Sequence, residues 1–256
     1  MKKKNLLWCA LVIVGMVALV GCDQIEIRND SGLASINIGG RASVQGSGSV
    51  ESRDFDVADF TGINISGNYE VIWQQASSYS LVIEMQENLF DYLEVAVRGN
   101  TLHIDSSRSF NTTSANRPRI YIESPSIDSA NFAGAINASN WDSIQGANFS
   151  VDTSGAVNLT FDLQVMNFQA SLAGAGDLTL TGQADVANVS SSGASTVEAL
   201  DLQTKAATIS ITGAGNVNVA VSDDLTVSLT GAGRVRYVGD PTITSTIIGP
   251  GSVQHQ

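Results

Sequence analysis

The 256-residue chain contains very little cysteine, and this scarcity limits both its cross-links and its metal chemistry. Only Cys9 and Cys22 are present, and Cys9 lies inside an apolar N-terminal segment. If that segment is removed, the mature chain keeps a single thiol. One thiol excludes an internal disulfide and a zinc site built from several cysteines.

Positive charge is also scarce. The chain has 13 Lys and Arg against 25 Asp and Glu, and its formal net charge is −12. Loss of Lys2, Lys3 and Lys4 would leave ten cations against the same 25 acids, a formal charge of −15. Nucleic-acid binding depends on cations that neutralise phosphates, so we expect no nucleic-acid partner. The same charge opposes an electrostatic attachment to anionic lipids.

The N-terminus has the pattern of a bacterial export signal. Three lysines precede the apolar run LLWCALVIVGMVALV, whose length of about 15 residues is shorter than the roughly 20 of a membrane-spanning helix. The following Leu19-Val20-Gly21-Cys22 resembles the lipobox of bacterial lipoproteins. This resemblance implies cleavage before Cys22 and attachment of diacylglycerol to its sulfur, with palmitate-type acyl chains as the membrane anchor. The alternative is an ordinary secretory signal with an incidental cysteine.

We therefore predict three regions: a lipoprotein signal peptide at 1–21, a lipidated flexible tether at 22–45 and a folded domain at 46–256. The tether is rich in Ser, Gly and Asn and lacks a sustained apolar run. Its segments IEI and INI are compatible with short strands instead. The predicted location is the bacterial cell envelope, with the protein facing the periplasm or the exterior.

The folded domain has the signature of β-structure. From Gly46 onward, apolar residues alternate with polar ones between Gly-Asn pairs at 67–68 and 99–100, which we interpret as turns. The segment QENLFDYLEV at 86–95 is the only candidate helix after residue 22, and it is short. We expect an all-β fold.

The second half of the chain is repetitive. Small-residue corners recur with first glycines 21, 19, 19, 20, 18 and 18 residues apart, namely Gly134, Gly155, Gly174, Gly193, Gly213, Gly231 and Gly249. A period of this length is typical of a solenoid whose units cover each other's apolar faces. We predict a right-handed parallel β-helix with coils of about 18–21 residues, in which glycine supplies positive φ at each corner.

The residues that carry a family resemblance are GSGSVESRDFDVADFTGINISGNYEVIWQQ, VIEMQENLFDYLEVAVRGNTLHID, RIYIESPSIDSANFAGA and GAGRVRYVGDPTITSTIIGPGSV. Together they span roughly 46–254 and resemble the head GIN domain family of auto-transporter adhesins. The resemblance implies a β-helix-like domain in the cell envelope and supplies no catalytic residues. Several corners here lack a second glycine, as at Ser154-Gly155-Ala156-Val157.

Few residues suit catalysis or a cofactor. Gly213-Ala214-Gly215 leads into a strand pattern with no following lysine, which excludes a phosphate-binding loop. His103, which alternation places on an outward face, and His255, near the C-terminus, are the only histidines available to a catalytic triad. We predict no catalytic residue, no cofactor and no metal site, and Cys22 as the lipidation site.

Acidic and aromatic residues leave two alternatives open. Carboxylates paired in a groove would suit polysaccharide cleavage, and the candidates are Asp152, Asp162, Asp185, Asp201, Asp223, Asp224 and Asp240. Trp73 is expected to fill the core, whereas Trp141 is the best candidate for an exposed sugar-stacking ring. The favoured function is a non-catalytic, adhesin-like head that binds an envelope protein or a glycan. A β-helix carbohydrate-active enzyme is the alternative, and an envelope signalling accessory is a third.

Overall fold

The computed structural model describes residues 25–29, 32–36 and 43–256, and the chain divides into two compact units, Met1–Ala42 and Ser43–Gln256. In the first unit, β1 (Ile25–Asn29) pairs antiparallel with β2 (Gly32–Ile36). The segment IEI therefore lies in a strand, which is the alternative that the sequence left open for this part of the predicted tether. The predicted signal peptide and Cys22 lie outside the described residues. Among those described, no helix has the length and hydrophobicity needed to cross a bilayer.

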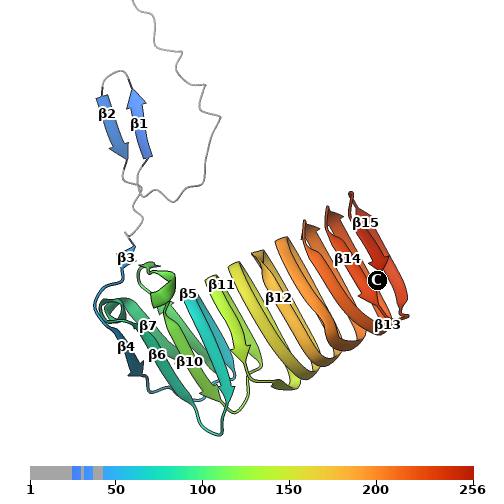
Figure 1. Cartoon of the computed structure of the whole chain (residues 1–256), viewed down its shortest axis with the longest axis horizontal. Helices are drawn as coiled ribbons and strands as arrows, with labels where there is room; N and C mark the ends of the chain where they lie inside the picture. Colours follow the sequence, from blue (N-terminus) through green and yellow to red (C-terminus); the bar gives the residue numbers. More distant parts are fainter. Residues whose placement is uncertain (1–24, 30–31, 37–42) are drawn as a thin grey trace, which may run out of the picture. The chain divides into compact units, whose positions relative to one another are not determined.

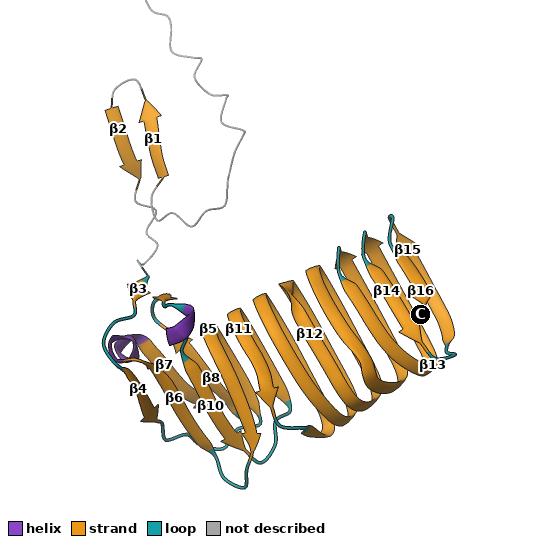
Figure 2. Ribbon diagram, in the orientation of Figure 1, coloured by secondary structure: helices purple, strands orange, loops and turns teal. Residues whose placement is uncertain are grey.

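The second unit is built on one open, mixed sheet of twelve strands (Figure 2), which confirms the all-β prediction. Its first part contains β4 (Val50–Asp54), β5 (Gly62–Gln75), β6 (Ser80–Gln86), β7 (Leu93–Arg98), β8 (Thr101–Ser106) and β10 (Arg119–Ser124). Beside it, β3 (Val44–Gln45) and β9 (Phe110–Asn111) pair in parallel as a separate two-stranded sheet. Two short 3₁₀ helices, η1 (Glu87–Tyr92) and η2 (Ser114–Asn116), interrupt these strands. The short candidate helix at 86–95 is the 3₁₀ helix η1, followed by the start of β7.

The second part consists of β11 (Ser129–Trp141), β12 (Ile144–Gly213), β13 (Asn216–Gly231), β14 (Arg234–Val238), β15 (Thr242–Ile248) and β16 (Ser252–His255). Every pair among them is parallel, and β11 also pairs in parallel with β5. In Figure 1, β12 is a continuous extended segment that curves back repeatedly beside itself. We call residues 129–256 the parallel stack.

The prediction of a uniform parallel β-helix over 46–256 is wrong for the first part of the domain, because several of its strands pair antiparallel. In residues 43–128, which we call the mixed region, β6 pairs antiparallel with β4 and β10, and β7 pairs antiparallel with β8. The β7–β8 hairpin forms because Gly99 (φ 55°) and Asn100 (φ 63°) make a two-residue turn with both φ angles positive, which matches the twist of the strands. The other expected turn, at Gly67, lies inside β5.

The glycines of the parallel stack lie directly over one another and over Gly67 of β5. Gly67 pairs with Gly134, Gly134 with Gly155 and Gly213 with Gly231. A Cβ atom added to any glycine of the ladder after Gly67 would collide with the backbone carbonyl oxygen of the glycine one repeat earlier. The glycine ladder consists of Gly67, Gly134, Gly155, Gly174, Gly193, Gly213, Gly231 and Gly249, all with φ between 107° and 143°. These glycines have the positive φ expected of them, and the close backbone contact explains why only glycine fits.

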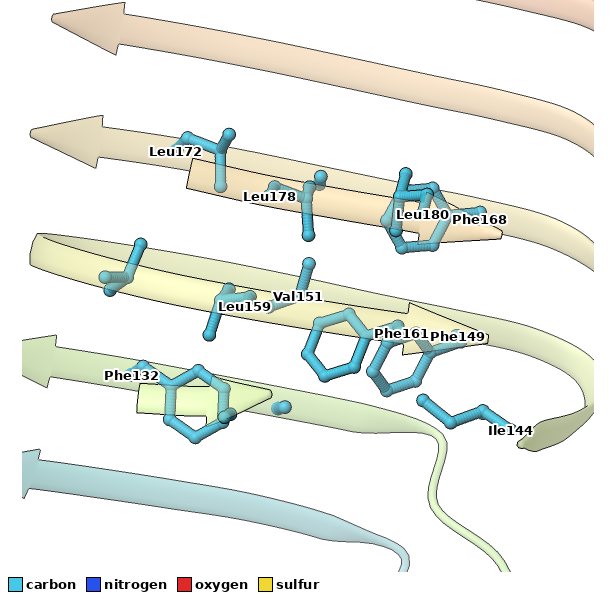
Figure 3. Close-up of a cluster of buried hydrophobic side chains, with 14 of the residues drawn as sticks. Phe132, Ile144, Phe149, Val151, Leu159, Phe161, Phe168, Leu172, Leu178 and Leu180 are labelled. Atoms are coloured by element: carbon cyan, nitrogen blue, oxygen red, sulfur yellow. The ribbon is translucent and has the colours of Figure 1, made fainter. Parts of the chain in front are cut away.

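Alternate side chains of the parallel stack point inward and form one continuous core with those of the mixed region. Figure 3 shows side chains from successive passes of the chain filling the same interior layer. The rings of Phe149 and Phe161 are 5.4 Å apart, and those of Phe149 and Phe168 are 6.1 Å apart. Aromatic pairs at such distances stabilise the fold beyond the effect of burying their apolar surface. Because these side chains fill the interior, any binding site must be formed by the outward-facing side chains.

Candidate binding site

Trp141 does not form the exposed sugar-stacking ring that the sequence suggested. Its ring lies 5.8 Å from that of Trp73 and 5.0 Å from that of Phe161, and its Nε1 donates to the carbonyl oxygen of Val71 at 3.0 Å. Trp73 is 1% exposed, as expected for a core residue. The two tryptophans are adjacent because the parallel pairing of β11 with β5, after a register shift between Asn137 and Asn140, places Trp141 opposite Trp73. Half-buried Trp141 therefore belongs to the core boundary.

The two histidines lie on strands far apart in the sheet order. His103 is in β8 between the fully buried Leu102 and Ile104, so it takes the outward face as predicted. His255 is in β16, where its Nε2 lies 3.1 Å from the carbonyl oxygen of Gly239. No triad containing both is assembled in the part of the chain that the structure describes.

The seven candidate aspartates are spread over successive repeats of the parallel stack. Asp162 accepts a hydrogen bond from Thr181 at 3.2 Å, and Asp185 forms an ion pair with Lys205 at 2.8 Å. Within the described ranges, no group of three or more His, Cys, Asp or Glu side chains is placed to hold a metal ion. Asp185 also lines a cavity.

That cavity has a volume of about 410 Å³, and we call it the corner cavity. It is lined by Gln183, Ala184, Asp185, Gln203, Thr204, Lys205, Ala220, Val221, Ser222, Val238 and Gly239. It lies where the register between β12 and β13 shifts, between Ala199 and Gln203 and again between Thr204 and Ala206. Adjacent repeats of unequal length cannot stack closely there, and the gap remains as a hollow.

Lys205 of the corner cavity does not suit base catalysis. The Asp185 carboxylate accepts a hydrogen bond from Lys205 and attracts its charge, and this raises the pKa of the Lys205 ammonium, with a smaller contribution from Asp223. A lysine held protonated in this way cannot remove a proton from a substrate. The pair instead offers one cation and one carboxylate for recognition.

A second hollow, of about 430 Å³, lies over β5, β7 and β8, and we call it the polar hollow. Its lining residues are Asn64, Leu93, Glu94, Val95, Ala96, Arg98, His103 and Asp105. Among these residues, only His103 was a candidate from the sequence. The others were missed because the hollow needs three strands in one register, and the alternation within a single strand does not reveal its neighbours.

Register explains how the polar hollow forms. Ala96 and Asn64 both lie beside His103, on opposite sides, and Glu94 lies beside Asp105. Alternate residues of a strand share a face, so Glu94, Ala96 and Arg98 project to the same side. The short Ala96 side chain leaves room between its two long neighbours, and all three residues line the hollow.

The side chains of the polar hollow have free hydrogen-bonding capacity. Asp105 Oδ1 accepts a bond from the backbone N–H of Ser106 at 2.7 Å. Across residues 43–256, the side chains of Asn64, Glu94, Arg98 and His103 form neither hydrogen bonds nor ion pairs with the protein. Carboxylate acceptors, guanidinium donors, an amide and an imidazole therefore converge on one concave surface.

Comparisons with known proteins agree with this architecture. The fold is similar to that of a putative adhesin from Bacteroides fragilis NCTC 9343, with 24% identity, a TM-score of 0.76 and coverage of 84% of this chain and 100% of that one. A putative adhesin from Parabacteroides merdae ATCC 43184 has 20% identity and a TM-score of 0.67, over 84% of this chain and 99% of that one. A "putative lipid binding protein" from Parabacteroides distasonis ATCC 8503 has 24% identity and a TM-score of 0.67, over 84% and 100%. At these identities the likeness concerns the fold.

No curated protein matches the chain significantly. Residues 59–241, well over half of the chain, match the family model described as "Putative auto-transporter adhesin, head GIN domain". The resemblance found in the sequence is thereby confirmed: the chain belongs to the head GIN domain family of auto-transporter adhesins.

Proposed function

We propose that this protein is a lipid-anchored envelope protein whose β-sheet head binds a glycan without transforming it. The polar hollow is the observation that carries this proposal. A glycan presents many hydroxyl groups, each of which can donate and accept a hydrogen bond. The free Glu94 carboxylate accepts from hydroxyls and Arg98 donates to them, while Asn64 can do both. Membership of an adhesin family supports a binding role.

The regions predicted from the sequence complete the proposal. A signal peptide at 1–21 and lipidation of Cys22 would attach the protein to a membrane, and residues 22–45 would link that anchor to the head at 46–256. We further propose that the parallel stack winds as a right-handed β-helix with coils of 18–21 residues. Its parallel pairing and its glycine ladder support this winding.

The glycan proposal is tested by a variant that fills the hollow. Ala96→Trp places a large ring between Glu94 and Arg98 on the outward face and leaves the core side of the sheet unchanged. The full chain, solubilised in detergent, would be applied to an array of envelope and capsular glycans. We expect the unmodified chain to bind at least one class, and Ala96→Trp to weaken that binding by about tenfold or more.

The matched pair for a smaller change is Asn64→Ala and Asn158→Ala. Asn64 lines the hollow, whereas Asn158 is an exposed asparagine of β12 that lines neither cavity. Only the first should reduce glycan binding. Binding that survives Ala96→Trp unchanged, or an unmodified chain that binds no glycan, would remove the polar hollow as the site.

The lipid anchor has a separate test. Blocking the lipoprotein signal peptidase with globomycin should cause a larger precursor to accumulate, and Cys22→Ala should abolish labelling by a palmitate analogue. A precursor of unchanged size in globomycin would contradict lipidation and leave the glycan proposal standing.

A second function, cleavage of a polysaccharide, is favoured by the corner cavity. There Asp185 and Lys205 lie on adjacent repeats with Asp223 close enough to influence Lys205, as an acidic groove with one cation would require. Incubation with cell-wall and capsular polysaccharides should then release new reducing ends or unsaturated sugars, and Asp185→Asn should abolish the release. The absence of products across the panel would reject this function.

A further inference from the structure

We propose that two copies of this chain associate through β15, which pairs antiparallel with β15 of the second copy about a two-fold axis at Ser245. β15 belongs to the last repeat and pairs only with β13 within the described part of the chain. One edge of β15 therefore presents unpaired backbone N–H and C=O groups, which readily pair with another strand.

The side chains of β15 show that this edge carries apolar surface. Ile243 and Ile247 are 40% and 41% exposed, and Ile248 is 64% exposed. In the preceding repeat, the register partners of Ile243 and Ile247 are Leu225 and Leu229, both 0% exposed. The isoleucines thus continue two columns of the core to a position where the described chain places nothing over them.

The edge also lacks the usual protection against strand pairing. Residues 241–256 contain no Asp, Glu, Lys or Arg, although the whole chain carries a formal charge of −12. The opposite edge strand, β4, contains Glu51, Arg53 and Asp54, and such charges oppose edge-to-edge association. Two copies therefore repel each other over most of their surface and can approach without charge repulsion at β15.

The sequence of β15 identifies the partner as a second copy. Around Ser245, the strand reads Ile-Thr-Ser-Thr-Ile in both directions. An antiparallel pair centred on Ser245 places Ile243 opposite Ile247 of the second copy and Thr244 opposite its Thr246. Ile–Ile and Thr–Thr pairs are favourable cross-strand neighbours. The same surface serves on both copies, as a two-fold interface requires.

Disulfide trapping tests the geometry. In the full chain, Ser245→Cys places two thiols directly opposite each other across the interface, so mild oxidation should give a dimer on a non-reducing gel. Thr242→Cys lies three residues from the axis, so its two copies are about 20 Å apart along the strands and should not cross-link. The unmodified chain measures any contribution of Cys9 and Cys22.

Charge swapping tests the pairing without relying on loss of stability. Thr244→Lys with Thr246→Lys sets lysine opposite lysine and should weaken association, measured by sedimentation of the full chain in detergent, by about tenfold or more. Thr244→Lys with Thr246→Glu sets lysine opposite glutamate and should restore it. Thr208→Lys, in the same column but two strands inward, is the control and should leave association unchanged.

Three results would overturn the proposal. The unmodified chain could remain a monomer, the double-lysine variant could associate as tightly as the unmodified chain, or Thr242→Cys could cross-link as efficiently as Ser245→Cys. The last result would place the strand contact at another register or with another partner.

Discussion

The mixed region and the parallel stack solve the same packing problem in different ways. In the mixed region, individual side chains hold particular strands together. Arg119 of β10 donates to Glu70 of β5 at 3.0 Å and to Glu84 of β6 at 2.9 Å, which ties three strands together. In the parallel stack, the glycine ladder repeats one contact at every level. The mixed region depends on specific pairs of different side chains. The parallel stack depends on the same residue, glycine, at the same position of successive repeats.

The hydrogen bonds of the two tryptophans follow the same division. Trp73 Nε1 donates to the buried Ser124 Oγ at 2.8 Å, and that hydroxyl donates to the carbonyl oxygen of Ser126 at 3.0 Å. This chain of side-chain bonds lies within the mixed region. Trp141, where the stack begins, bonds to a backbone carbonyl instead. The difference teaches that a substitution at Ser124 can remove the partner of Trp73, whereas no side-chain substitution removes the carbonyl oxygen that Trp141 uses.

The largest effect should come from the glycine ladder. A Cβ atom on Gly213 would lie 2.5 Å from the carbonyl oxygen of Gly193, and its φ of 123° is unfavourable for any other residue. We expect Gly213→Ala to lower the free energy of unfolding by about 3 kcal/mol or more, from backbone strain and displacement of the adjacent repeat. Thermal or denaturant unfolding measures the change.

Gly146→Ala is the matched control for this substitution. Gly146 also lies in β12, but nothing is within 4 Å of the position that its Cβ atom would take. Its substitution should change stability by only a few tenths of a kcal/mol. Equal effects at Gly146 and Gly213 would show that the ladder does not limit the stack.

Trp141, at the junction of the two regions, should give the next largest effect. Trp141→Ala removes contacts with the rings of Trp73 and Phe161 and should destabilise the protein by about 3 kcal/mol. Trp141→Phe keeps an aromatic ring but loses the bond to Val71, and should cost about 1 kcal/mol or slightly more. A negligible effect of Trp141→Ala would revive its role as a surface ring.

Arg119 tests the side-chain mode of the mixed region. Its side chain is 43% exposed, so solvent screens both ion pairs, and Arg119→Met should cost about 0.5–1 kcal/mol. Lys205→Met removes one more exposed pair in the stack and should have no measurable effect. Unfolding at low and high salt distinguishes the two, because only the loss at Arg119 should shrink as salt rises.

Tyr69 of β5 should have the smallest effect at neutral pH and a larger one in alkali. Burial raises the pKa of the Tyr69 hydroxyl above its usual value near 10, and Ser106 opposes this only in part. Above pH 10 the unfolded chain loses this proton while the folded chain retains it. Stability should therefore fall by up to about 1.4 kcal/mol per pH unit.

Tyr69→Phe removes the titrating hydroxyl and should remove this part of the alkaline slope, with a change of less than about 1 kcal/mol at pH 7. Denaturant unfolding at pH 7, 10 and 11 provides the comparison. Identical slopes for the two proteins would mean that Tyr69 is not buried in solution as the structure describes.

Sequence patterns predicted the parallel stack better than the mixed region, for a physical reason. In the stack each residue meets its counterpart about 19 positions away, so the spacing of Gly155 and Gly174 already contains the contact. In the mixed region, the partners of Arg119 are 49 and 35 residues away and share no period with it. Such pairs depend on the assembled sheet, which no local pattern encodes.

The corner cavity could also have been predicted from the glycine spacing. The interval from Gly193 to Gly213 is 20 residues and the next interval is 18, and this mismatch accompanies the register shifts that leave the hollow. Trp141 was misjudged for the opposite reason. Its polar neighbours suggested solvent, whereas its position opposite Trp73 depends on pairing with a strand about 70 residues earlier.

The glycine ladder also means that this architecture can change length in whole units. Each ladder glycine contacts the one before it, so a segment running from one ladder position to the next can be gained or lost without creating a new kind of contact. Each such event would alter the head by one strand spacing, about 4.8 Å, and leave both ends as they are. Evolution can therefore adjust how far the last repeat lies from the mixed region through duplication or deletion of about 19 codons.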